Sequence, residues 1–297
     1  MPLFGQFDRK VCVQVGVVGV IVLMALVCVV QLLSMSSGDL DTEMAHETRM
    51  RRQVKIDYPS LSLPTYIRDM APLPDVRNIS MQIKVKTGFR TFDTKSGKQH
   101  WVYVRETVPL EYDNETDSKQ DILLFHGARF SSKTWEDLGT MNLLSALGYR
   151  VVAVDIPGFG RSPRVEVTDR VEFVRDLIPE FGLNWPVLVT PSMSGSYALP
   201  FVFRAEPPHI TALVTLAPVF TAEFSRQQYK NFMIPTLAIY GENDLDIGLS
   251  GITELSYMGN KYAYMIPDAG HAFYISKTRM FHQILYNFLE ALPSNYI

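Results

Sequence analysis

Short, largely apolar runs recur from residue 122 to residue 266, and longer helix-like segments separate them. A strand without a polar face is buried on both sides, which is typical of a parallel sheet covered by helices on each face. At 297 residues and 47% hydrophobic content, the chain can bury one core of that kind. We therefore predict an α/β fold with a mostly parallel, doubly wound sheet. Its strands are expected at residues 122–125, 150–155, 187–189, 210–217, 236–240 and 262–266.

Two further strands are expected ahead of these runs. Residues 79–86 and 101–108 alternate between apolar and polar side chains, which is the period of a strand. Joined by a hairpin-like loop, the two strands would form an antiparallel edge of the sheet. Helices are predicted at residues 135–147, 168–181 and 277–292.

Residues 187–196 read V-L-V-T-P-S-M-S-G-S and change character within a few positions. An apolar strand is followed by a tight turn of small residues and then by a helix-like segment. This is the arrangement of a nucleophile elbow, in which the residues two before and two after the nucleophilic serine must be small. Ser194 fits as the nucleophile, because Ser192 and Ser196 flank it. The alternative is a polar turn, in which serines are ordinary.

Three residues suited to acyl transfer follow predicted strands in the order Ser194, Asp244, His271. In open α/β sheets the ligand site lies beyond the carboxyl ends of the strands. A serine hydroxyl needs a histidine to take its proton, and a carboxylate to fix the imidazole tautomer. Asp246 and Glu242 are alternatives for the acid, and each residue taken singly also has a structural explanation.

The tetrahedral oxyanion of acyl transfer needs two preset hydrogen-bond donors. The backbone N–H of Gly195 is one candidate. The N–H of Ala128, in the loop after the first parallel strand, is the other. His126 is expected to shape that loop, and no strand end is evident for the remaining histidines: His46, His100, His209 and His282.

The N-terminal part of the chain indicates a membrane anchor. Residues 11–33 contain no charged side chain and are long enough for a bilayer-spanning helix. Arg9 and Lys10 precede this run, so the N-terminus is expected in the cytosol and the C-terminal part in the lumen or outside the cell. The predicted organisation is a cytosolic tail at residues 1–10, an anchor at 11–33, a proline-containing stalk at 34–77 and a catalytic domain at 78–297. A cleaved signal peptide is the alternative to the anchor.

Two sequons, at Asn78 and Asn114, favour lumenal exposure of the domain. The basic cluster at residues 49–52 is either a processing site that would release a soluble form or a juxtamembrane cluster without that role. The net charge of −3 does not suggest nucleic acid as a partner. Both cysteines, Cys12 and Cys28, lie in the apolar run, so we expect no disulfide, thiol nucleophile or cysteine metal site in the folded domain. No cofactor or metal is expected.

Several motifs together carry a family resemblance. They are His126-Gly127 with Phe130-Ser131-Ser132 and Thr134-Trp135-Glu136, Asp155-Ile156-Pro157-Gly158-Phe159-Gly160, Pro191-Ser192-Met193-Ser194-Gly195, Tyr240-Gly241-Glu242 with Asp244, and Ala269-Gly270-His271-Ala272. With these motifs, residues from about 121 to 292 resemble the α/β-hydrolase family, and more narrowly the alpha/beta hydrolase domain-containing protein 14 group. An S-x-S-G elbow is usual in that group, and the apolar N-terminal run makes the chain similar to its membrane-bound A form.

The resemblance implies an α/β-hydrolase fold and hydrolysis of short acyl esters, with acyl transfer from lysine to coenzyme A in soluble relatives. It implies Ser194 as nucleophile, Asp244 as acid, His271 as base, and Ala128 with Gly195 as oxyanion donors. Many relatives insert a helical lid between the strands that here end near residue 217 and begin at 236; this chain has little room for one, which favours small acyl groups. We therefore expect a membrane-anchored serine hydrolase acting on small acyl esters or amides. The alternative is a catalytically silent binding or scaffold protein of the secretory pathway.

Overall fold

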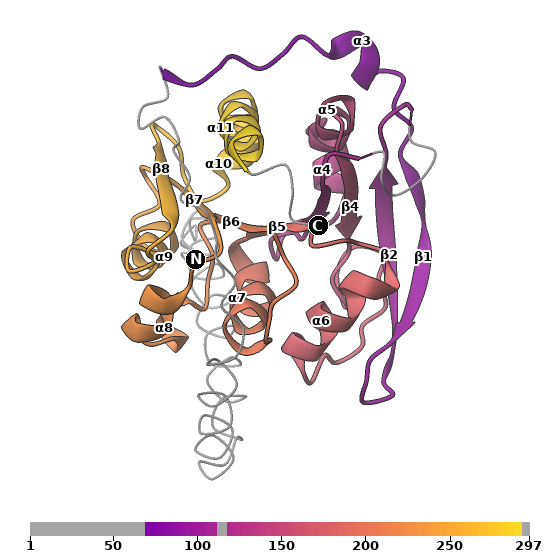
Figure 1. Cartoon of the computed structure of the whole chain (residues 1–297), viewed down its shortest axis with the longest axis vertical. Helices are drawn as coiled ribbons and strands as arrows, with labels where there is room; N and C mark the ends of the chain where they lie inside the picture. The colour runs from indigo at the N-terminus through magenta and orange to yellow at the C-terminus, as the bar shows by residue number, and fades with distance from the viewer. Residues whose placement is uncertain (1–68, 112–117, 293–297) are drawn as a thin grey trace, which may run out of the picture. The chain divides into compact units, whose positions relative to one another are not determined.

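The computed structural model describes residues 69–111 and 118–292, and every structural statement below concerns this part of the chain. Its strands form one sheet in the order β1-β2-β4-β3-β5-β6-β7-β8 (Figure 1). From β4 through β8 in that order, neighbouring strands run parallel. The strand β2 pairs antiparallel with β4 on one side and with β1 on the other. The predicted parallel sheet with an antiparallel edge is confirmed. The strands are β1 (Lys86–Asp93), β2 (Gln99–Thr107), β3 (Asp121–Leu124), β4 (Arg150–Val154), β5 (Val187–Pro191), β6 (Ala212–Leu216), β7 (Thr236–Gly241) and β8 (Lys261–Ile266).

The prediction of a first strand at residues 79–86 is wrong. Residues Arg77–Ser80 form the short helix α3, and β1 begins only at Lys86. Ile79 and Met81, whose alternation suggested a strand, are 41% and 76% exposed. The edge strand β1 buries only Phe92, so its position is set by pairing with β2, from Lys86 opposite Glu106 to Asp93 opposite Gln99. Local apolar alternation carries little information about such a strand.

Helices cover both faces of the sheet (Figure 1). On one face lie α4 (Lys133–Asp137), α5 (Thr140–Ala146), α10 (Phe273–Ser276) and α11 (Thr278–Ala291). On the other lie α6 (Arg170–Glu180), α7 (Gly195–Arg204), α8 (Arg226–Asn231) and α9 (Ile247–Leu255). The single helix predicted at 135–147 is two helices, because Gly139 between α4 and α5 has a left-handed φ of 69°.

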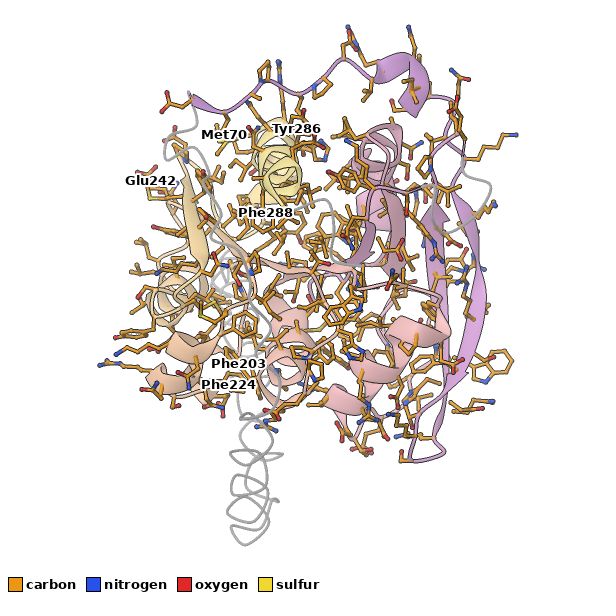
Figure 2. All side chains as sticks on the ribbon, in the orientation of Figure 1. Met70, Phe203, Phe224, Glu242, Tyr286 and Phe288 are labelled. Carbon is orange, nitrogen blue, oxygen red and sulfur yellow. The ribbon has the colours of Figure 1, made fainter. Side chains whose placement is uncertain are left out.

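The central strands supply side chains to two separate cores. In β5, Leu188 joins the core under α6 and α7, while Val187 and Val189 join the core under α5 and α11. Figure 2 shows Phe203 and Phe224 together in the first core, with ring centroids 4.6 Å apart. Successive residues of a strand point to opposite faces, so a doubly covered strand has no polar face. Burial on both faces fixes the strands rigidly, and it leaves polar groups mainly at the strand ends.

The segment before β1 lies against the domain where the structure describes it. Met70 is buried in the core that contains α11, and Tyr286 packs against the same core (Figure 2). The backbone N–H of Ala71 donates to Oδ1 of Asn287, and the Ala71 carbonyl accepts from Nδ2 of the same side chain, both at 2.9 Å. The last residues of the predicted stalk are therefore in contact with α11.

The predicted anchor at residues 11–33, the basic cluster at 49–52 and the sequon at Asn114 lie outside the described residues. Within residues 69–111 and 118–292, no helix has the length and apolar character needed to cross a bilayer.

Candidate active site

A strained turn at the carboxyl end of β5 presents Ser192. The residue has a φ of 49°, in the left-handed region that side chains other than glycine rarely adopt. It follows Pro191, the last residue of β5, and begins the short 3₁₀ turn Ser192–Ser194 that leads into α7. The backbone N–H of Val219, after β6, donates to the Ser192 carbonyl at 3.1 Å. Strand, strained apex and helix together have the geometry of a nucleophile elbow with Ser192 at its tip.

His271 connects this serine to a buried carboxylate. Its Nε2 lies 2.8 Å from Ser192 Oγ, and its Nδ1 lies 2.6 Å from Asp244 Oδ2. The carboxylate can only accept, so Nδ1 carries the proton and Nε2 is free to accept from the serine hydroxyl. The Asp244 side chain is 6% exposed and that of His271 is 36% exposed. A shielded carboxylate thus orients an imidazole that is open to solvent.

The prediction that Ser194 meets the histidine is wrong. The Ser194 hydroxyl donates to the Pro191 carbonyl at 2.8 Å and accepts from Thr190 Oγ1 at 3.0 Å, and the residue is fully buried. The strand β5 extends to Pro191 and the strained residue follows it directly, so the apex of the turn is residue 192, two residues before the predicted apex. With Ser192 at the apex, the small flanking residues are Thr190 and Ser194, which hydrogen bond to each other.

Gly195 does not occupy the position predicted for an oxyanion donor. It is the first residue of α7, and its backbone N–H points to the Ser192 carbonyl. A side chain there would overlap the Val219 carbonyl, so this glycine permits close packing of the elbow against the loop after β6. The residue that follows Ser192 directly is Met193.

The loop after β3 lies beside the elbow. A Cβ atom built on Gly127 would be 3.6 Å from Ser192 Cβ, which places Gly127, the residue before Ala128, beside the serine. His126 holds this loop: Nδ1–H donates to the Gly127 carbonyl at 2.9 Å, and Nε2 accepts from the Ile156 N–H at 3.0 Å. Burial lowers the pKa of His126, so its ring is neutral, as these two bonds require. These contacts agree with the loop-shaping role expected for His126.

Asp155 connects the same loop to the turn after β4, a role that sequence reasoning missed. Its Oδ1 accepts from the Ser132 N–H at 2.6 Å, and its Oδ2 accepts from the Arg161 N–H at 2.8 Å. Gly160 has a left-handed φ of 54°, and a side chain on it would overlap the Asp155 carboxylate. An aspartate at a strand end followed by P-G-F-G was the available signal.

The other acidic candidates have different surroundings. Glu242 accepts from the backbone N–H of Asp268 at 2.9 Å, and Figure 2 shows it at the side of the molecule. Asp246 precedes α9 and lines a shallow depression with Leu245 and Leu249. Asp244 is thus the carboxylate that contacts His271.

The remaining predicted positions fall into three groups. Nε2 of His282 lies 2.8 Å from Thr140 Oγ1, His100 stacks on Phe92, and His209 packs on Trp185. Asn78 is exposed on α3. His46 and Asn114 lie outside the described residues. Within the part of the chain that the structure describes, no group of three or more His, Cys, Asp or Glu side chains is arranged to hold a metal ion.

Comparison with known proteins agrees with the α/β fold. Residues 122–249 match the model of the alpha/beta hydrolase family. The chain is 39% identical over 196 residues to Protein ABHD14A of Rattus norvegicus, across 65% of this chain and 79% of that protein. It is 36% identical over 197 residues to a Rattus norvegicus protein named "Putative protein-lysine deacylase ABHD14B", across 64% of this chain and 91% of that protein. A crystal structure described as a "predicted CIB-like hydrolase" from Thermoplasma acidophilum has a TM-score of 0.58 and 26% identity, across 69% of this chain and 99% of that one.

Proposed function

This chain belongs to the alpha/beta hydrolase family and, within it, to the ABHD14 group, and on that premise we propose that it is a serine hydrolase that cleaves or transfers small acyl groups. The observation that carries the proposal is the unbroken hydrogen-bonded series from Ser192 through His271 to Asp244. Such a series activates a hydroxyl for attack on an acyl carbonyl.

The proposed reaction has two halves. Ser192 Oγ attacks the acyl carbonyl while its proton passes to Nε2 of His271, and the imidazolium forms next to the Asp244 carboxylate. His271 then returns the proton to the departing alcohol or amine, which leaves an acyl group on Ser192. A water molecule, or another acceptor nucleophile, gives its proton to His271 and releases the acyl group. The backbone N–H groups of Met193 and Ala128 are the proposed donors to the oxyanion, with Met193 replacing Gly195.

An open site supports small acyl groups as the substrate class. Between β6 and β7 the chain forms only the 3₁₀ turn η4 (Thr221–Glu223) and the short helix α8, so no helical lid is inserted there. The name of the ABHD14B relative adds an acylated lysine amide as a candidate substrate beside simple esters.

We further propose that residues 11–33 anchor the protein in a membrane with the catalytic domain in the lumen or outside the cell. The uncharged run and the exposed position of Asn78 support this arrangement. Glycosidase treatment of protein expressed in animal cells should increase its electrophoretic mobility. An unchanged mobility, equal to that of an Asn78→Gln, Asn114→Gln variant, would place the domain in the cytosol.

Labelling with a fluorophosphonate probe tests the enzyme proposal. The wild-type protein should be labelled, and Ser192→Ala should abolish labelling because the attacking oxygen is removed. Ser194→Ala is the matched control: it removes a buried hydroxyl two residues away and should retain labelling. If the folded wild-type protein does not react with the probe, the alternative of a catalytically silent binding or scaffold protein is favoured. Labelling lost only in Ser194→Ala would contradict the assignment of the nucleophile.

A further inference from the structure

Tyr274 lies three residues after His271, on α10, with its ring held firmly in place. The ring stacks on Trp135 at 5.3 Å between centroids and meets the edge of Phe130 at 6.1 Å. Trp135 is itself fixed, because its indole N–H donates to the Phe125 carbonyl at 2.8 Å. A tyrosine packed in this way has little rotamer freedom, so its hydroxyl has a defined position.

The hydroxyl of Tyr274 faces the loop of Gly127. A Cβ atom built on Gly127 would lie 3.6 Å from the Tyr274 hydroxyl oxygen, 3.6 Å from Ser192 Cβ and 3.4 Å from a ring carbon of Phe130. Gly127 has no side chain, so a small space remains between the tyrosine hydroxyl and the serine. The space lies on the side of Ser192 where the loop of Gly127 and Ala128 runs.

Two other buried tyrosine hydroxyls have acceptors within the protein. Tyr149 hydrogen bonds to Glu290 at 2.9 Å, and Tyr229 donates to the Thr221 carbonyl at 2.6 Å. Within residues 69–111 and 118–292, the Tyr274 hydroxyl has no such acceptor, although the residue is only 3% exposed. The oxygen of this hydroxyl is not fully enclosed by protein, so it can meet a bound molecule, and beside Ser192 that partner can be the substrate.

We propose that the Tyr274 hydroxyl donates a hydrogen bond to the acyl oxygen of a substrate bound at Ser192, and so acts as a catalytic residue beside the two backbone donors. The proposal rests on the serine hydrolase function proposed above. Burial raises the pKa of Tyr274, so the hydroxyl keeps its proton at neutral pH and can donate it to a hydrogen bond. A donor aimed at developing negative charge lowers the barrier more than it improves substrate binding.

Tyr274→Phe is the direct test, with Tyr149→Phe as the matched control. Both changes remove one hydroxyl from a buried ring, but Tyr149 contacts α11 through Glu290 instead of facing Ser192. We expect the second-order rate of fluorophosphonate labelling to fall about tenfold or more in Tyr274→Phe, because the probe's phosphoryl oxygen occupies the oxyanion site. Tyr149→Phe should keep the wild-type rate. A folded Tyr274→Phe protein with the wild-type labelling rate would overturn the proposal.

Inhibition by a small boronic acid separates this role from a structural one. A boronate on Ser192 resembles the tetrahedral intermediate, so its affinity should fall in Tyr274→Phe in parallel with the labelling rate. A slower labelling rate with unchanged boronate affinity would mean that the tyrosine acts only on the packing of α10, against the proposal.

Gly127→Ala provides an independent test of the space itself. The added methyl group would make ordinary van der Waals contacts, and the backbone of Gly127 is not left-handed, so this variant should fold. It should nevertheless lose labelling, because the methyl group fills the region between Ser192 and Tyr274. Full labelling of Gly127→Ala would show that the space does not receive the acyl oxygen.

The two proposals fail in different ways. If Ser192→Ala retains wild-type labelling, the serine hydrolase function itself is wrong. If Ser192→Ala is unreactive while Tyr274→Phe and Gly127→Ala both react at the wild-type rate, the hydrolase stands and only the role of Tyr274 is rejected.

Discussion

At the scale of single residues, hydrogen bonding decides what each polar group at the site can do. Ser192 and Ser194 are chemically identical, yet only Ser192 reaches His271, while Ser194 is committed to Thr190 and the Pro191 carbonyl. The hydroxyls of Thr190 and Ser194 satisfy each other at positions where glycine is usual in an elbow. The Ser194 hydroxyl is therefore bonded within the turn and does not reach the histidine.

His282 gives a residue-scale prediction for stability. Burial lowers its pKa to about 4 from an ordinary 6.5, and it stays neutral beside Thr140 in the folded protein. Between pH 6.5 and 4 the unfolded chain takes up a proton there and the folded protein does not. The free energy of unfolding should therefore fall by up to about 1.4 kcal/mol per pH unit as pH decreases through this range.

Urea denaturation of wild type and His282→Gln at several pH values measures this contribution. Glutamine keeps a polar group near Thr140 but cannot titrate, so its stability should decline less steeply between pH 6.5 and 4. Parallel profiles for the two proteins would contradict the assignment.

At the scale of elements, the site depends on loops that are tied to one another across the strand ends. Asp155 holds the backbone of Ser132 after β3 and of Arg161 after β4. The Ser192 carbonyl accepts from Val219 after β6. These bonds connect the loop after β3 to the turn after β4, and the turn after β5 to the loop after β6, so a change in one member of a pair should alter the geometry of the other.

Gly160→Ala tests that connection. The methyl group of the alanine would overlap the Asp155 carboxylate, so the carboxylate must move away from Ser132 and Arg161. The backbone at residue 160 also has a left-handed φ, which alanine adopts only with strain. We expect a loss of several kcal/mol in the free energy of unfolding or, in protein that still folds, a marked loss of labelling at Ser192.

Gly97→Ala is the control, because Gly97 has a left-handed φ of 81° but no neighbour within 4 Å. It should cost only about 1 kcal/mol and leave labelling intact; equal effects in both variants would contradict the role of Asp155.

At the scale of the whole molecule, the short connection between β6 and β7 leaves the carboxyl edge of the sheet without a helical cover. Long acyl chains gain affinity mainly by burying apolar surface, and a site without a lid offers little of it. Hydrolysis of p-nitrophenyl esters from acetate to dodecanoate should therefore show the highest kcat/KM at two to four acyl carbons, with a decline of about tenfold or more at twelve. A kcat/KM that increases with chain length would require an apolar channel and would refute this view.

The sequence by itself determined the α/β architecture, because strands that are apolar at every position can only be buried between two layers of helices. It also determined that Asp244 and His271 follow neighbouring strands, since the carboxyl ends of parallel strands meet at one edge. The edge strand β1 was misplaced, because pairing with β2 and not its own burial defines it.

Only the tertiary structure decided which serine meets the histidine. Residues 192, 194 and 196 are all serine and all small, so local chemistry does not distinguish them. The turn begins where β5 ends, and β5 extends to Pro191 because Thr190 and Pro191 pair with Thr215 and Leu216 of β6. That pairing joins residues distant in sequence, and it sets where the left-handed backbone at Ser192 begins. Residues 187–196 alone therefore do not predict the position of the turn.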